Sequence, residues 1–253
     1  MRNGIRSGIA VAAVLAATGI AHADELQLLS AASMQTVFKE IIGDFEGRSG
    51  HRVSLRYSTM GAITERVKAG ERADLVISSP ASISALVESG KLTAGSEVTV
   101  ARTGVGIIVP AGSPKPRIES VADFRHALLE ARVIVYADPA GGGAAGIHIA
   151  RLIERLRLSG RLKAKTKFGT GGDVAEVTLA EGQGALGLTQ VSEIVGKPGA
   201  LFIPVPDVLQ NYTGFVAGTP AGAKESPAVK AFIEFLKTPE VTAVMRDKGM
   251  QAN

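Results

Sequence analysis

Apolar and polar positions along the first hundred residues repeat as a short apolar run followed by an amphipathic stretch. The run 26–29 comes first, and Val37, Ile41 and Phe45 then recur at helical spacing until Gly50. The pattern occurs twice more, as strand 53–57 with helix 61–69, and as strand 75–77 with a helix that Ser79-Pro80 caps and Gly90 ends. This βαβαβα order predicts a parallel sheet covered by helices.

A second series of alternating elements begins after residue 104. Strands are predicted at 105–109, 133–137, 185–188 and 201–205, with a further strand on which Lys163, Lys165 and Lys167 alternate. Helices are predicted at 120–131, from about 145 to 158, and at 173–181, 232–236 and 241–245. Two α/β units joined near 100–105 and again near 205–215 indicate two lobes with two crossings between them. Such lobes can close like a hinge over a ligand.

The first 23 residues have the pattern of an export signal. Arg2 and Arg6 precede an apolar run at 8–20, and Ala21-His22-Ala23 provides the small residues of a cleavage site. The run is short and rich in alanine and glycine, which favours a signal peptide over a membrane anchor of roughly 20 strongly apolar residues. The mature protein is therefore expected to begin at Asp24 and to be secreted into the periplasm.

The composition removes several classes of function. Without Arg2 and Arg6 the mature chain has 26 basic residues against 24 acidic ones, a net charge too small to indicate nucleic acid or a membrane surface as a partner. The chain has no cysteine, which excludes disulfides, thiolate catalysis and cysteine metal ligands. The four histidines share no metal-ligand spacing. We expect no metal, no cofactor and a monomeric protein.

The sequence GGGAAG at 141–146 has the spacing G-x-G-x-x-G of dinucleotide-binding loops. Such a site also needs an acid about 20 positions further on, at the end of the next strand, and none occurs there before Asp173. Glycines also let the N–H groups that start a helix approach a small anion. Three more strand-to-helix junctions are rich in hydroxyls or glycine: Ser33, 58–61 and 169–174. Each alone fits an ordinary cap, but four that meet at one crevice favour an anion site.

Several segments resemble the periplasmic molybdate-binding proteins of ABC importers, within the type II periplasmic binding proteins. They are LLSAASM, ERVKAGERADLVIS, AAGIHIARLIERL, LAEGQGALGL and the ending SPAVKAFIEFLKTPEVTAVMRDKGM, which together cover essentially the whole mature chain. The resemblance implies an α/β fold of two lobes with a central cleft and two hinge crossings. Lobe 1 is expected at 24–104, lobe 2 at 105–207 and a return to lobe 1 at 208–253. The resemblance also implies that the protein captures a small anion for an ABC permease.

The same resemblance implies where the anion binds. In that family a serine from each of two loops, two backbone amides and a tyrosine hydroxyl hold the oxyanion. Carried over, these positions are Ser33, Met60 with the hydroxyls of Ser58 and Thr59 beside it, the amides of Ala145 and Val174, and Gln190. Met60 and Gln190 depart from the family's serine and tyrosine, and an amide side chain suits a carboxylate or hydroxyl ligand. A multi-carboxylate is therefore favoured over molybdate, with a molybdate-like oxyanion as the alternative.

A related branch, which the chain resembles in LLSAASM, DPAGGGAAGIH, VSEI and LQNYT, includes bacterial aconitate isomerases, enzymes that interconvert cis- and trans-aconitate. This alternative function needs a base with a pKa near neutral. His148, in the first turn after the glycine loop, is one candidate, because a helix N-terminus keeps an imidazole neutral. Alternatively, His148 is a surface residue of that helix without a role in the site. Tyr212 at the second crossing is another candidate, because its hydroxyl could donate a hydrogen bond into the cleft. Alternatively, Tyr212 only packs at the hinge.

Overall fold

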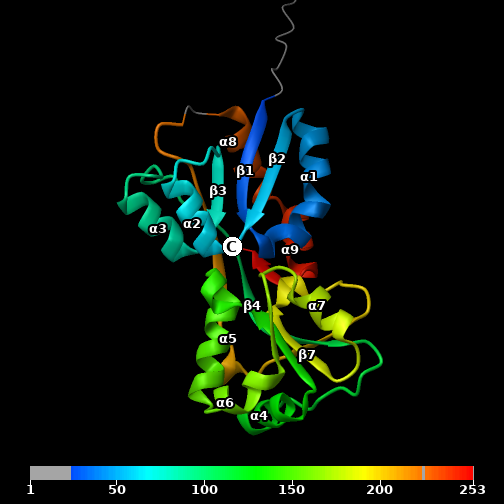
Figure 1. Ribbon diagram of the computed structural model, residues 1–253. Helices are drawn as coiled ribbons and strands as arrows, with labels where there is room; N and C mark the ends of the chain where they lie inside the picture. The colour runs from blue at the N-terminus through cyan, green and yellow to red at the C-terminus, as the bar shows by residue number, and fades with distance from the viewer. Residues whose placement is uncertain (1–23, 224–225, 253) are drawn as a thin grey trace, which may run out of the picture.

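A computed structural model describes residues 24–223 and 226–252 of the chain, which form two lobes (Figure 1). The predicted α/β class and the two-lobe arrangement are confirmed. The predicted signal peptide at 1–23 lies outside the described residues. Across the two described ranges, no helix combines the length and the apolar character needed to cross a membrane.

The helices and strands follow one another in the alternating order that the sequence predicts. The strands are β1 (Glu25–Ala31), β2 (Arg52–Ser58), β3 (Leu75–Ser78), β4 (Val98–Pro110), β5 (Val133–Ala137), β6 (Thr166–Gly169), β7 (Ala185–Gln190), β8 (Ala200–Pro204), β9 (Tyr212–Gly218) and β10 (Met250–Ala252). The α-helices are α1 (Gln35–Ser49), α2 (Met60–Lys68), α3 (Pro80–Glu88), α4 (Val121–Glu130), α5 (Ala144–Arg155), α6 (Ser159–Leu162), α7 (Val174–Glu181), α8 (Pro227–Leu236) and α9 (Pro239–Asp247). Short 3-10 turns are η1 (Ala32–Met34), η2 (Pro139–Gly141), η3 (Lys163–Lys165), η4 (Val191–Glu193) and η5 (Asp207–Leu209).

The first lobe contains the N-terminal strands and both C-terminal helices. Its strands run in the order β2-β1-β3-β9-β4, with β1 parallel to β2 and β3, and with β9 antiparallel to β3 and β4. Phe232 of α8 is fully buried against Phe38 and Phe45 of α1, at ring-centroid distances of 5.9 and 5.0 Å. The C-terminal segment therefore completes the core of the lobe in which the chain begins.

The second lobe is a smaller sheet covered by helices. Its strands run in the order β4-β7-β5-β6, with β8 also paired to β4, and β5 is parallel to β6 and β7. Phe124 and Leu128 of α4, Ile149 of α5 and Leu158 are buried in one core cluster. Residues at the carboxyl ends of β1, β5 and β7 line one pocket, so the loops that follow these strands meet there.

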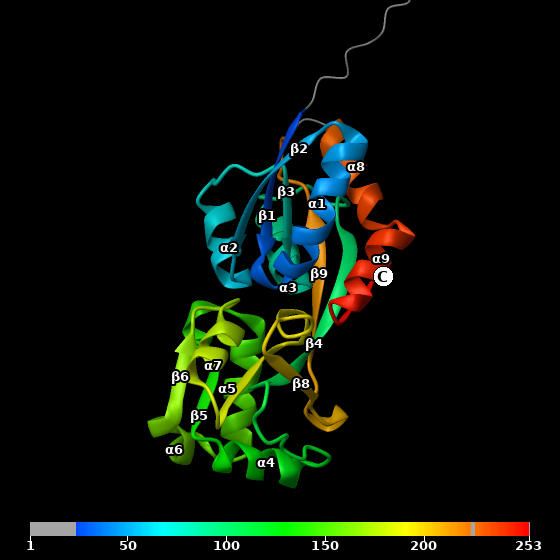
Figure 2. The same cartoon turned by 90° about the vertical axis from the view of Figure 1, so that its right-hand side faces the viewer.

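The first crossing between the lobes, expected as a joint near 100–105, is the middle of the long strand β4. Its first half pairs with β9 and its second half with β7 and β8, so one strand belongs to both sheets (Figure 2). At the change of partner, Val105 donates its N–H to Gln210 Oε1 at 2.7 Å, and Gln210 Nε2 donates to the Val105 carbonyl at 3.1 Å. Gln210 thus ties the two crossings together.

The prediction of a strand from the alternating lysines was wrong for residues 163–165. Residues 163–165 form the turn η3, and the strand begins only at Thr166. Lys165 Nζ donates to the carbonyl of Ala131 at 2.7 Å, and Thr166 Oγ1 donates to the carbonyl of Leu162 at 2.9 Å. These bonds to carbonyls at two helix ends favour a turn where the side-chain pattern alone resembled a strand.

Candidate functional site

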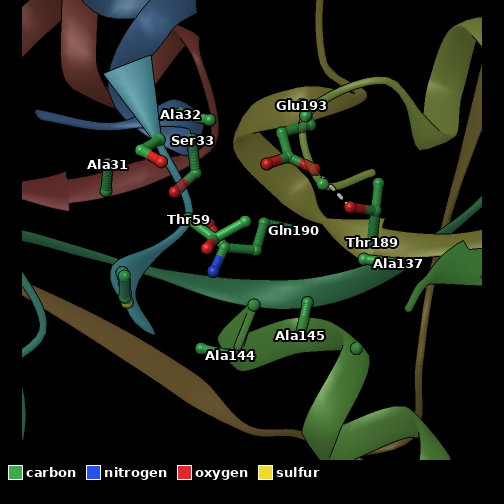
Figure 3. Close-up of a pocket in the computed structure, with 16 residues that line it drawn as sticks. Ala31, Ala32, Ser33, Thr59, Ala137, Ala144, Ala145, Thr189, Gln190 and Glu193 are labelled. Carbon is green, nitrogen blue, oxygen red and sulfur yellow. Dashed lines mark hydrogen bonds between the residues drawn. The ribbon is translucent and has the colours of Figure 1, made fainter. Parts of the chain in front are cut away.

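A pocket lies between the two lobes, where the strand-to-helix junctions meet (Figure 3). The first lobe contributes residues of two junctions, 31–33 and 58–60, and the second lobe contributes the start of α5 and the end of β7. Its sixteen lining residues are Ala31, Ala32, Ser33, Ser58, Thr59, Met60, Ala137, Gly143, Ala144, Ala145, Gly146, Gly171, Gly172, Thr189, Gln190 and Glu193. The cavity volume is about 40 Å³, so a compact ligand, or one end of a larger ligand, fits in this conformation.

The glycine loop presents the start of helix α5 to the pocket. Gly143 occupies the N-cap position and provides no side-chain cap, so the N–H groups of the first turn have no partner within the helix. A Cβ atom on Gly146 would lie 2.3 Å from the Ala137 carbonyl oxygen. Glycine is therefore required there for close packing of α5 on β5, and the G-x-G-x-x-G spacing serves this packing and the exposure of the amides.

Hydrogen bonds across the cleft hold the lobes in a closed arrangement. Thr59 Oγ1 donates to the Gly141 carbonyl at 2.6 Å, and the Gly61 N–H donates to the Gly142 carbonyl at 3.3 Å. On the other side, Ser192 Oγ donates to the Ser33 carbonyl at 3.1 Å. The pocket is thus enclosed by both lobes, as expected for a hinged cleft.

Gln190 brings a buried polar group to the pocket wall. The residue is 4% exposed, and its Oε1 atom has no hydrogen-bond partner among the described residues. Buried polar atoms are nearly always paired, so an unpaired one at a pocket indicates a place for a ligand. Ser33, also buried, lies across the pocket from it (Figure 3).

Glu193 is a pocket residue that sequence reasoning missed. It lies in the turn η4, three positions beyond Gln190, and Thr189 Oγ1 donates a hydrogen bond to its Oε2 atom. Burial raises the pKa of Glu193 to about 7, and the Thr189 hydrogen bond only partly offsets this. Its place just past the end of β7, in the segment TQVSEI, is the signal that identifies it.

The structure brings together Ser33, Ser58, Thr59, Met60, Ala145 and Gln190, but not the other three predicted site residues. Val174 is fully buried at the start of α7. His148 lies on the side of α5 that faces η5, where its Nε2 atom bonds the Leu209 carbonyl at 3.1 Å. Tyr212 is half exposed, with the Arg102 guanidinium 5.1 Å from its ring centre. The predicted catalytic pair, His148 and Tyr212, therefore lies outside the pocket lining.

Comparison with known proteins accounts for this architecture. Residues 26–251 match the family described as bacterial extracellular solute-binding protein. The chain belongs to this family. The match extends over both lobes and includes every residue that lines the pocket.

Individual relatives of this solute-binding protein fall into the two groups that the sequence resembles. It is 28% identical over 247 residues to the molybdate-binding protein ModA of Rhodobacter capsulatus, covering 97% of this chain and 96% of the relative. It is 26% identical over 233 residues to an aconitate isomerase of Pseudomonas sp., covering 89% and 87%. The solved periplasmic molybdate-binding protein of Azotobacter vinelandii is 17% identical with a TM-score of 0.76, covering 89% and 98%. The predicted molybdate-binding-like family, with its isomerase branch, is confirmed.

Proposed function

We propose that this solute-binding protein captures a small anion, a carboxylate or a molybdate-like oxyanion, in the periplasm and delivers it to an ABC permease. The observation that carries the proposal is the set of neutral donors that face one pocket from both lobes. Hydroxyls come from Ser33 and Ser58, and backbone N–H groups come from the start of α5. Closure over the ligand buries these donors, which strengthens their interaction with a negative charge.

Aconitate isomerisation is the second candidate function, and Glu193 is the observation that favours it. A proton that moves along an allylic system needs a group able to accept it on one side and return it on the other. A carboxyl in the pocket whose pKa is about 7 meets this requirement. Glu193 therefore replaces His148 and Tyr212 as the base for this alternative.

Calorimetry and proton NMR on the chain from Asp24 onward test the two functions together. We expect heat of binding with molybdate or with cis-aconitate, and a vinyl signal of cis-aconitate that changes on binding without conversion. Growth of the trans-aconitate signal would replace transport by isomerisation as the function. Heat with molybdate alone would reject the multi-carboxylate ligand, and absence of heat with either anion would reject anion capture.

Removing the Ser33 hydroxyl is expected to weaken binding without unfolding the protein. A hydrogen bond to a charged partner contributes roughly 1.5 to 3 kcal/mol, so Ser33→Ala should raise the Kd by about tenfold or more. Ser84→Ala, at an exposed position on α3 of the same lobe, is the matched control and should leave the Kd unchanged. An unaltered Kd for Ser33→Ala would place the ligand elsewhere.

A further inference from the structure

The pocket combines donors suited to an anion with a carboxyl group. Among the described residues that line it, none is lysine or arginine, and Glu193 is the one with an ionisable side chain. A carboxylate beside a bound anion repels it strongly in a desolvated cleft, because the effective dielectric constant there is low. The charge of Glu193 therefore decides whether an anion can enter.

The geometry of the carboxyl group places one of its oxygens toward the ligand. Oε2 accepts a hydrogen bond from the Thr189 hydroxyl, and the other oxygen is directed into the pocket on the side of Ser33 (Figure 3). When the carboxyl is protonated, the oxygen that accepts from Thr189 serves as its carbonyl and the other carries the proton. The acid then becomes one more neutral donor aimed into the pocket.

The charged residues behind the pocket do not keep Glu193 ionised. Lys197, the cation whose charge acts on Glu193, is ion-paired with Glu176 of α7. Glu176 and Asp173 both raise the pKa of Glu193. Lys197 lowers the pKa of Glu193, but burial outweighs this effect, and Lys197 already has an acidic partner.

The cationic side chains on the other elements packed against η4 are bound to residues other than Glu193. On β4, Arg102 Nε donates to Gln251 Oε1 at 2.7 Å. At the end of α9, Lys248 is ion-paired with Glu40. The turn η1, Ala32–Met34, has no charged residue. The protein therefore admits an anion most readily when Glu193 is neutral.

We propose that Glu193 binds the ligand in its protonated form, as a hydrogen-bond donor, so that capture of the anion at alkaline pH takes up one proton. This inference rests on the proposed anion capture and identifies the residue that makes it depend on pH. In the closed arrangement without ligand, burial raises the pKa of Glu193 to about 7. Below that pH the acid is already protonated and the affinity is constant. Above it, each pH unit lowers the affinity about tenfold, because a proton must first be bound.

Calorimetry with molybdate and with cis-aconitate, between about pH 7.5 and 9, measures this coupling. Repeating each titration in two buffers of different ionisation enthalpy gives the number of protons taken up. We expect close to one proton per anion at the upper end of the range, and a Kd that rises about tenfold per pH unit. Binding without proton uptake would overturn the inference and leave anion capture standing, whereas no binding of either anion by the wild type would overturn both.

Glu193→Gln is the decisive variant, because its amide has nearly the shape of the protonated acid. The amide keeps an acceptor for the Thr189 hydroxyl and a donor for the ligand. It should bind the anion at every pH with the affinity that the wild type reaches below pH 7, and without proton uptake. A variant that retains the pH dependence of the wild type would contradict the inference. The melting temperature of the variant, measured with and without ligand at one pH, shows whether the variant is folded.

Discussion

Replacing Gly61 with valine is expected to lower anion affinity between about fivefold and a hundredfold, with both lobes still folded. A Cβ atom at Gly61 would lie 3.1 Å from the Cα atom, 3.5 Å from the carbonyl oxygen and 3.7 Å from the carbonyl carbon of Gly142, which belongs to the other lobe. Gly61 lies in the first turn of α2, where a side chain is tolerated by the helix itself. The added volume therefore collides only when the lobes meet. Overpacking of this kind costs about 1 to 3 kcal/mol, which closure would take from the binding free energy.

Calorimetry gives the affinity of Gly61→Val, and small-angle X-ray scattering gives the shape with and without ligand. The wild type should become more compact on binding, and the variant should stay extended at the same ligand concentration. Gly43→Ala is the matched control, because Gly43 lies in helix α1 with open space around its Cα. If Gly61→Val binds as the wild type does, the glycine contact between the lobes does not limit closure.

The alternation of strands and helices could be predicted because its determinants are local. Ser79 caps α3 by accepting the Ser82 N–H at 3.2 Å, with Pro80 in the first turn, as the sequence indicates. The full length of β4 could not be predicted, because Thr99 and Arg102 interrupt its apolar pattern. It is a continuous strand because its first half pairs with β9 and its second half with β7. Both partner strands are distant from β4 in the sequence, so the local pattern does not show the pairing.

The candidate site could be predicted where it depends on strand ends. Ser33 and Gln190 follow β1 and end β7, and parallel strands bring their carboxyl ends to one edge. Glu193 could not be predicted in the same way, since its raised pKa depends on burial, which the local sequence does not show. His148 looked equally suited on its own helix, but its direction is set by the turn η5, which packs on that side of α5. Local patterns place a residue on an element, and only the packing of elements decides what it faces.

Truncating Phe232 to alanine is expected to lower the free energy of unfolding by about 3 to 5 kcal/mol, the usual cost of removing a fully buried aromatic side chain. Phe232 lies on α8 and packs edge-on against Phe45 of α1, so its loss opens a cavity between two segments far apart in the sequence. Urea denaturation followed by circular dichroism measures the change, with Val208→Ala as a control at a position that is 75% exposed. The control should change the free energy by less than about 0.5 kcal/mol. Because Phe232 lies outside the pocket lining, the folded variant should retain its anion affinity. A change in the free energy of unfolding near zero would mean that α8 lies on the first lobe without contributing to its core. The first lobe would then be stable without the C-terminal segment.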